Sequence, residues 1–132
     1  MQEFYEVKII SDFAGAHRLR NFKGKCEELH GHNWKVEVVV RGTRLDESGV
    51  LIDFGELKEA TREVLSKLDH KYLNDLPYFK EINPSSENIA KYIFEKLSKR
   101  FNSEKVQVYS VSAWESEKAC ATYFGKGAEN AS

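Results

Sequence analysis

The amino-acid sequence predicts an α+β fold, with two helices covering one face of a four-stranded antiparallel sheet. Stretches near both ends alternate polar and apolar residues, which is typical of strands. Two middle stretches instead repeat apolar residues at helical spacing. The order is therefore strand, strand, helix, helix, strand, strand. In a chain of 132 residues this pattern indicates a single domain.

The first strand is expected over residues 4–13, after which the small residues 14–16 deliver His17 just past its end. The second is expected from about His30 to Gly42. Side chains on a strand alternate between its two faces. One face of the second strand therefore carries four apolar residues: Trp34, Val36, Val38 and Val40.

Start signals mark both helices. Asp53, with Glu56 three residues later, resembles an N-cap pair, and the helix is expected to end near Leu68. Pro84 and the serines Ser85 and Ser86 begin the second helix. Apolar stripes follow each start: Leu57, Ala60, Val64, Leu65 and Leu68, then Ile89, Ala90, Ile93, Phe94 and Leu97.

The third strand is expected over 106–114 and is followed by Glu115; the fourth covers about 119–124. Cys120 in that strand is expected to be a small buried packing residue. The domain then spans 1–124, and the small residues of 125–132 predict a flexible tail. The sheet face opposite the helices is expected to be largely apolar. Edge-to-edge assembly of sheets into a barrel would bury that face and the free edges.

Composition excludes several classes of function. A net charge of −1 argues against a nucleic-acid-binding protein. No apolar run approaches the roughly 18 residues of a membrane span, and the N-terminus lacks the pattern of a signal peptide. With only two cysteines, a cytoplasmic protein with reduced thiols is expected.

Chemistry-bearing residues concentrate between positions 17 and 32. His30 and His32 project from the same face of the second strand, and Gly31 between them leaves room for a ligand. With His17 they offer three imidazole nitrogens, and three histidines with an open fourth position form a catalytic zinc pattern. Cys26 fits two roles, a fourth ligand that closes a structural site or a metal-activated thiol that acts as acid or base.

A second candidate pair is Asp69–His70, expected at the end of the first helix. Both the helix C-terminus and the adjacent carboxylate favour the protonated imidazole. Basic residues before Cys26 could form an anion site or a solvated loop, and the start of the second helix could bind a polar ligand as well as be capped. The basic residues are Arg18, Arg20, Lys23 and Lys25.

Several short motifs together resemble the 6-pyruvoyltetrahydropterin synthase superfamily over about residues 4–124. They are Ala16-His17-Arg18-Leu19, Cys26 followed by His30-Gly31-His32, Ile52-Asp53-Phe54, Leu68-Asp69-His70, Tyr72-Leu73-Asn74, Asn83-Pro84-Ser85-Ser86-Glu87 and Glu115. The short interval between Cys26 and His30 is similar to the carboxy-forming branch of this superfamily. Relatives often carry Thr where Ser85 and Ser86 stand.

The resemblance implies a tunnelling fold (T-fold), with sheets joined into a barrel in a trimer-based homo-oligomer, a hexamer, and sites between subunits. It implies zinc bound by His17, His30 and His32. It also implies that Cys26 accepts a proton and that His70, with Asp69, relays protons. Glu115 would anchor a pterin.

The implied reaction converts 7,8-dihydroneopterin triphosphate to 6-carboxy-5,6,7,8-tetrahydropterin, acetaldehyde and triphosphate in the queuosine (7-deazaguanine) pathway. A zinc-dependent lyase fits the residue types, because a Lewis acid acidifies a neighbouring C–H and a thiolate removes the proton. The alternatives are the pyruvoyl-forming reaction of the same superfamily and a non-catalytic, zinc-stabilised pterin-binding module.

Overall fold

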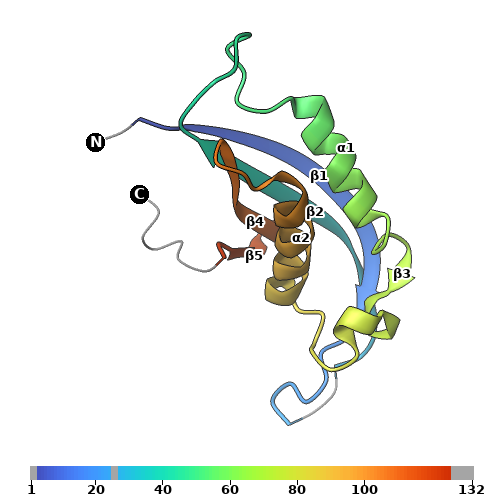
Figure 1. The fold of residues 1–132 in the computed structure, drawn as a ribbon. Helices are drawn as coiled ribbons and strands as arrows, with labels where there is room; N and C mark the ends of the chain where they lie inside the picture. Colours follow the sequence, from blue (N-terminus) through green and yellow to red (C-terminus); the bar gives the residue numbers. More distant parts are fainter. Residues whose placement is uncertain (1–2, 25–26, 126–132) are drawn as a thin grey trace.

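The computed structural model describes residues 3–24 and 27–125. Its elements run in the order β1 (Tyr5–His17), β2 (His30–Gly42), α1 (Phe54–Leu65), β3 (Lys71–Tyr72), α2 (Ser86–Phe101), β4 (Val106–Ser116) and β5 (Ala119–Tyr123). Two short 3₁₀ turns, Leu73–Asp75 and Pro77–Phe79, separate β3 from α2. Both helices pack on one face of a curved sheet (Figure 1). The α+β class and the chain order of the long elements are therefore as predicted.

The sheet has five strands rather than the four predicted, in the order β3-β1-β2-β4-β5. The additional strand, β3, is two residues long and runs parallel to β1, pairing Gly15 with Lys71 and Ala16 with Tyr72. Two residues are too short to show alternation, so periodicity could not reveal this strand. It nevertheless covers the end of β1 that carries His17.

The long hairpin of β1 and β2 fixes the geometry of the histidines. The antiparallel register runs without interruption from Tyr5 opposite Gly42 to His17 opposite His30. β1 thus continues through residues 14–16, and His17 is its last residue rather than lying beyond it. Their small size predicts the end of the strand, but backbone pairing to β2 and β3 holds residues 14–16 extended.

Alternation along β2 supplies the core. Trp34, Val36, Val38 and Val40 are fully buried, as the pattern predicted. They meet the apolar stripes of both helices; α1 lies against β1, and α2 against β4 and β5. Full burial of a side chain of this size contributes about 1.5–3 kcal/mol relative to exposure. The core therefore holds the histidine-bearing end of β2 on a rigid support.

Both predicted helix caps form. The Asp53 carboxylate accepts a hydrogen bond from the Gly55 amide at 3.1 Å, and the Ser85 hydroxyl accepts one from the Asn88 amide at 3.1 Å. The first helix ends at Leu65, earlier than expected. Leu68 is still fully buried, in the turn that follows the helix.

The sheet face opposite the helices carries more charge than expected. Glu37 lies 3.4 Å from the Lys8 ammonium and accepts a hydrogen bond from the Trp114 indole at 2.7 Å. Cys120, which pairs with Trp114, is exposed, so the prediction of a buried packing residue is wrong. β5 is an edge strand that packs against α2, but Cys120 pairs with Trp114 and remains exposed.

Among the described residues, no helix has the length and apolarity that crossing a membrane requires. The predicted flexible tail falls largely on 126–132, which lie outside the described residues.

Candidate metal centre

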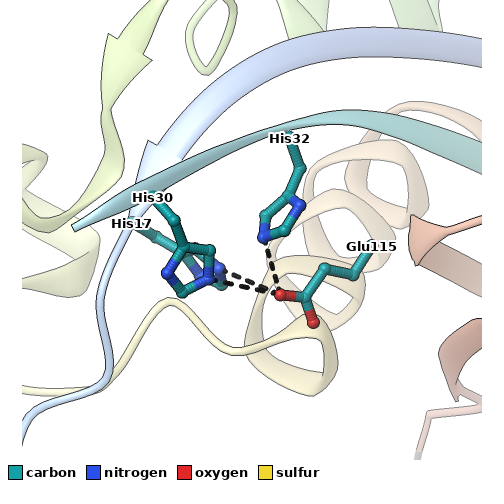
Figure 2. A group of neighbouring side chains, drawn as sticks. All are labelled: His17, His30, His32 and Glu115. Atoms are coloured by element: carbon teal, nitrogen blue, oxygen red, sulfur yellow. Dashed lines mark ion pairs between the residues drawn. The ribbon is translucent and has the colours of Figure 1, made fainter. Parts of the chain in front are cut away.

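Four side chains converge at the His17 end of the sheet, on the face that carries the helices. The Glu115 Oε1 atom lies 2.8 Å from the Nε2 of His32 and 3.4 Å from the Nε2 atoms of both His17 and His30. One ligand atom from each residue lies within 4.8 Å of all the others. Figure 2 shows the three imidazoles pointing toward a single carboxylate oxygen. This is the size and composition of a metal site.

Strand pairing brings these residues together. His17 and His30 face each other directly across β1 and β2, and His32 is two residues further along the same face of β2. Glu115 comes from β4, where the pairing with β5 shifts register between Trp114 and Ser116. Three strands thus supply four ligand candidates from one sheet face.

Backbone carbonyls set the tautomers of two imidazoles. The Nδ1 of His17 lies 2.6 Å from the Pro84 carbonyl oxygen, and the Nδ1 of His30 lies 3.0 Å from that of Glu28. A carbonyl oxygen only accepts, so each Nδ1 carries the proton. In the neutral rings the lone pair is then on Nε2, which faces the centre. This is the support that metal-binding histidines usually have.

Trp34 forms the floor of the site. Its buried indole donates a hydrogen bond to the Gly15 carbonyl at 3.2 Å, and the ring lies edge-on to His17 and His32 at centroid distances of 5.0 and 5.5 Å. Burial lowers the pKa of His32, the Glu115 carboxylate opposes that shift, and the neighbouring imidazoles add to it. The site therefore favours a neutral His32, the form that binds a metal.

Two of the ring nitrogens form no hydrogen bond of acceptable geometry with any residue that the structure describes. The Nε2 atoms of His17 and His32 are buried, and although Glu115 is close to both, its oxygen does not satisfy them. Unsatisfied buried polar atoms are unfavourable unless a ligand completes them. Three neutral imidazole nitrogens suit zinc and several other divalent ions. The residues present fit a bound metal ion.

Two buried or half-buried asparagines fix the chain just after His17. The Asn74 side chain accepts a hydrogen bond from the Arg18 amide and donates one to the Arg18 carbonyl, both at 3.0 Å. It thus pairs with the backbone of Arg18 as a neighbouring strand would. Asn83 makes the same pair of bonds to the backbone of Arg20. Both asparagines belong to motifs that carry the family resemblance, but their bonds to the backbone have no sequence pattern of their own.

Arg20 is not a free cation for an anionic ligand. Its guanidinium group donates to the backbone carbonyls of Phe79, Lys80 and Ile82, and to the side chain of Asn83. Arg18 and Lys23 are exposed. Of the basic residues considered for an anion site, Lys25 lies outside the described residues.

His70 is not part of the four-residue group. Its side chain is 81% exposed, and its Nε2 lies 3.6 Å from the Asp69 Oδ2. Asp69 and His70 are both tied to Ala14: the Asp69 Oδ1 accepts from its amide at 2.9 Å, and the His70 amide donates to its carbonyl at 2.6 Å. A backbone φ of 57° at His70 is an uncommon left-handed conformation. His70 and His32 nevertheless line one shallow depression of about 500 Å³.

Cys26 lies outside the described residues. The next residue, Glu27, bonds back to Leu19 through its amide at 3.0 Å and its carboxylate at 3.1 Å, which closes the loop between β1 and β2. Ser85 uses its hydroxyl as the α2 cap, and Ser86 is the first residue of that helix. Both follow Pro84, whose carbonyl contacts His17.

A larger groove of about 1,040 Å³ lies elsewhere, lined by α1 and α2 side chains and by the 3₁₀ turns. None of the candidate site residues that the structure describes lines it. Convergent ligand atoms, rather than cavity size, therefore mark the candidate site.

Comparison with known proteins places this geometry in context. The sequence profile of the family described as 6-pyruvoyl tetrahydropterin synthase matches residues 6–126. A relative from Archaeoglobus fulgidus, named "Putative 6-carboxy-5,6,7,8-tetrahydropterin synthase", is 40% identical over 109 residues, 82% of this chain and 90% of its own. The 6-pyruvoyl tetrahydrobiopterin synthase of Dictyostelium discoideum is 36% identical over 121 residues, 90% of this chain and 87% of its own. The solved structure of Caenorhabditis elegans 6-pyruvoyl tetrahydropterin synthase has a TM-score of 0.81 at 30% identity, and the match covers 95% of this chain and 98% of that one.

Proposed function

The chain belongs to the 6-pyruvoyl tetrahydropterin synthase family, and from that premise we propose that it is a zinc-dependent carbon–carbon lyase of the 6-carboxytetrahydropterin synthase type. Its substrate is 7,8-dihydroneopterin triphosphate. With uptake of water, the products are 6-carboxy-5,6,7,8-tetrahydropterin, acetaldehyde and triphosphate. The reaction belongs to queuosine biosynthesis in the cytoplasm.

The observation that carries the proposal is the convergence of three imidazoles whose Nε2 atoms face one point. Two of these atoms are buried without a hydrogen bond. A metal ion bound there would act as a Lewis acid toward substrate hydroxyls. Zinc is the proposed ion because three histidines with an open position form a recurring catalytic zinc set.

The remaining roles belong to the chain's own residues. Cys26 is the proton acceptor, since a thiol near a cation ionises readily. His70 relays protons, and Asp69 holds the pair against Ala14 of β1. Glu115 accepts the N–H donors of the pterin edge, and the start of α2 at Ser85 and Ser86 contributes polar contacts.

The oligomer completes the site. Within one copy, His70 is exposed and lies outside the group formed by the three histidines and Glu115. A trimer-based hexamer, with sheets joined at their edges into a barrel, would let one subunit supply the Asp69–His70 pair to the metal centre of another. β3 and β5 are the outer strands of the sheet formed by the described residues, and their free edges support this assembly.

The carboxy-forming branch is favoured by two observations. The interval between Cys26 and His30 is short, and the 40%-identical archaeal relative carries a name of that branch. The second candidate is the pyruvoyl-forming reaction, because relatives at 33–37% identity are named as 6-pyruvoyl tetrahydrobiopterin synthases.

The test compares the purified protein with its Cys26→Ser variant. Metal content and acetaldehyde release from 7,8-dihydroneopterin triphosphate are measured for both. We expect the parent to hold zinc and release acetaldehyde, and the variant to keep its zinc without releasing acetaldehyde.

Each alternative has its own outcome. Turnover without acetaldehyde, with a 6-pyruvoyl product, would assign the pyruvoyl-forming reaction. Loss of zinc from the variant together with no turnover by the parent would identify a structural site closed by Cys26 and overturn the enzyme proposal.

A further inference from the structure

The position of Glu115 relative to the three histidines matches that of a fourth metal ligand. In a tetrahedral zinc shell with metal–ligand bonds of about 2.0–2.2 Å, neighbouring ligand atoms lie about 3.3–3.5 Å apart. The Glu115 Oε1 lies 3.4, 3.4 and 2.8 Å from the Nε2 atoms of His17, His30 and His32. Two of the three separations equal a tetrahedral edge, and only the third is shorter.

The carboxylate of Glu115 has no competing partner among the described residues. Within the described part of the chain, its polar contacts are those with the three histidines. Neither Nε2 of His17 nor Nε2 of His32 forms a hydrogen bond with it of acceptable geometry. The oxygen is therefore close enough to all three rings to share a central ion with them.

The backbone at Glu115 forms an irregularity in the strand pairing. The pairing of β4 with β5 skips from Trp114–Cys120 to Ser116–Ala119, so Glu115 is the residue left over at this irregularity. Such bulges re-aim side chains near active sites. The Glu115 side chain is 36% exposed, as is that of His30, whereas those of His32 and His17 are 25% and 3% exposed. Solvent or substrate can therefore reach the Glu115 carboxylate.

We propose that Glu115 is an exchangeable fourth ligand, which closes the metal site in the substrate-free protein and leaves the ion when substrate arrives. The inference rests on the proposed function in that the three histidines must hold a metal ion. It deepens that function because the carboxylate released from the ion is the same group proposed to accept the pterin N–H donors. In this proposal Glu115 leaves the ion as substrate enters, and the released carboxylate then binds the pterin.

Cobalt(II) in place of zinc tests the inference without turnover, since its visible absorption reports the ligands. The variants are Glu115→Ala and Glu115→Gln; the control is Glu117→Ala, which removes an exposed carboxylate two residues away. We expect Glu115→Ala to bind cobalt at least roughly tenfold more weakly than the parent, with a changed spectrum. Glu117→Ala should match the parent. Adding 7,8-dihydroneopterin, the substrate without its triphosphate, should change the spectrum of the parent.

The outcomes separate the exchange from the proposed function. A parent that binds no cobalt overturns the metal site and the inference together. A parent that binds cobalt with the same affinity and spectrum as Glu115→Ala overturns the inference alone. A thiolate charge-transfer band that Cys26→Ser abolishes would make Cys26 the fourth ligand, and it also overturns the inference alone. A parent spectrum that does not respond to 7,8-dihydroneopterin leaves Glu115 a fixed ligand and overturns the exchange.

Discussion

His17 and Pro84 are 67 positions apart in the sequence, yet the Nδ1 of His17 lies 2.6 Å from the Pro84 carbonyl oxygen. Pro84 immediately precedes Ser85, the N-cap of α2. The start of a helix therefore orients an imidazole at the end of a strand. This contact links the stability of α2 to the shape of the metal site.

Ser85→Ala should weaken both the helix and metal binding. Loss of an N-cap hydroxyl costs about 1 kcal/mol of stability, and the loosened Pro84 carbonyl should lower metal affinity several-fold. Thermal unfolding and a metal titration measure the two effects. Ser85→Thr keeps a capping hydroxyl and is the control. Unchanged metal affinity in a destabilised Ser85→Ala protein would show that the cap does not support His17.

Replacing any one of His17, His30 and His32 by Ala should weaken metal binding at least roughly tenfold, so that the purified protein holds less than one ion per chain. Each variant loses one of the three nitrogen ligands and keeps only two imidazoles beside Glu115. His70→Ala is the matched control, because His70 is exposed and outside the group. Metal content of the purified proteins measures the difference. Loss of metal from His70→Ala as well would place that residue at the ion, contrary to the assignment.

Two substitutions of Asp69 should separate the effect of its hydrogen bond on stability from the effect of its charge on activity. Its Oδ1 accepts a hydrogen bond from the Ala14 amide. Asp69→Ala leaves that amide without a partner and should cost about 1–3 kcal/mol. Asp69→Asn can keep the bond, so it should unfold like the parent and lose activity through the missing charge beside His70. Equal destabilisation by both variants would argue against this division.

Metal-free protein should become less stable as the pH falls below the ordinary histidine pKa of 6.5. Burial lowers the pKa of His32 in the folded state. In the window between the lowered value and 6.5, the unfolded chain binds a proton that the folded chain does not, so the free energy of unfolding decreases on acidification. Thermal unfolding from pH 8 to pH 5 measures it. The decrease should be smaller in metal-free His32→Gln; an identical pH profile would contradict this cause.

Arg20→Lys should destabilise the protein without a specific defect in substrate affinity. A lysine cannot make the several bonds that the guanidinium makes to the 79–82 carbonyls. The expected loss is about 1–3 kcal/mol, measured by thermal unfolding. Lys23→Ala, at an exposed position of the same loop, should leave stability unchanged. A large rise in KM with normal stability in Arg20→Lys would instead make Arg20 a triphosphate ligand.

The sequence was most informative where one pattern dominates the local environment. Alternation placed β2 at His30–Gly42 and its buried face correctly, and the cap at Ser85 began α2 as predicted. It was least informative where tertiary pairing decides. Small residues 14–16 form the end of β1 because β2 and β3 pair with them, and two-residue β3 has no pattern to detect.

The same distinction applies to the site. Period-two spacing predicted that His30 and His32 share a face, and the strand register adds His17 opposite His30. Glu115 has the same parity as buried Ala113, which places it on the face of the histidines, but the bulge beside it in β4 has no pattern in the sequence.

The pairing of β1 with β2 is uninterrupted, so the three histidines come together only when the two strands are correctly aligned. Side chains change face with every residue, so a one-residue slip of β1 would remove His17 from its position opposite His30 and misplace the buried face of β1 at the same time. An ion bound by both strands would add its binding free energy to the correct alignment alone. Metal binding during folding would therefore stabilise the correct alignment of β1 and β2 over a slipped one.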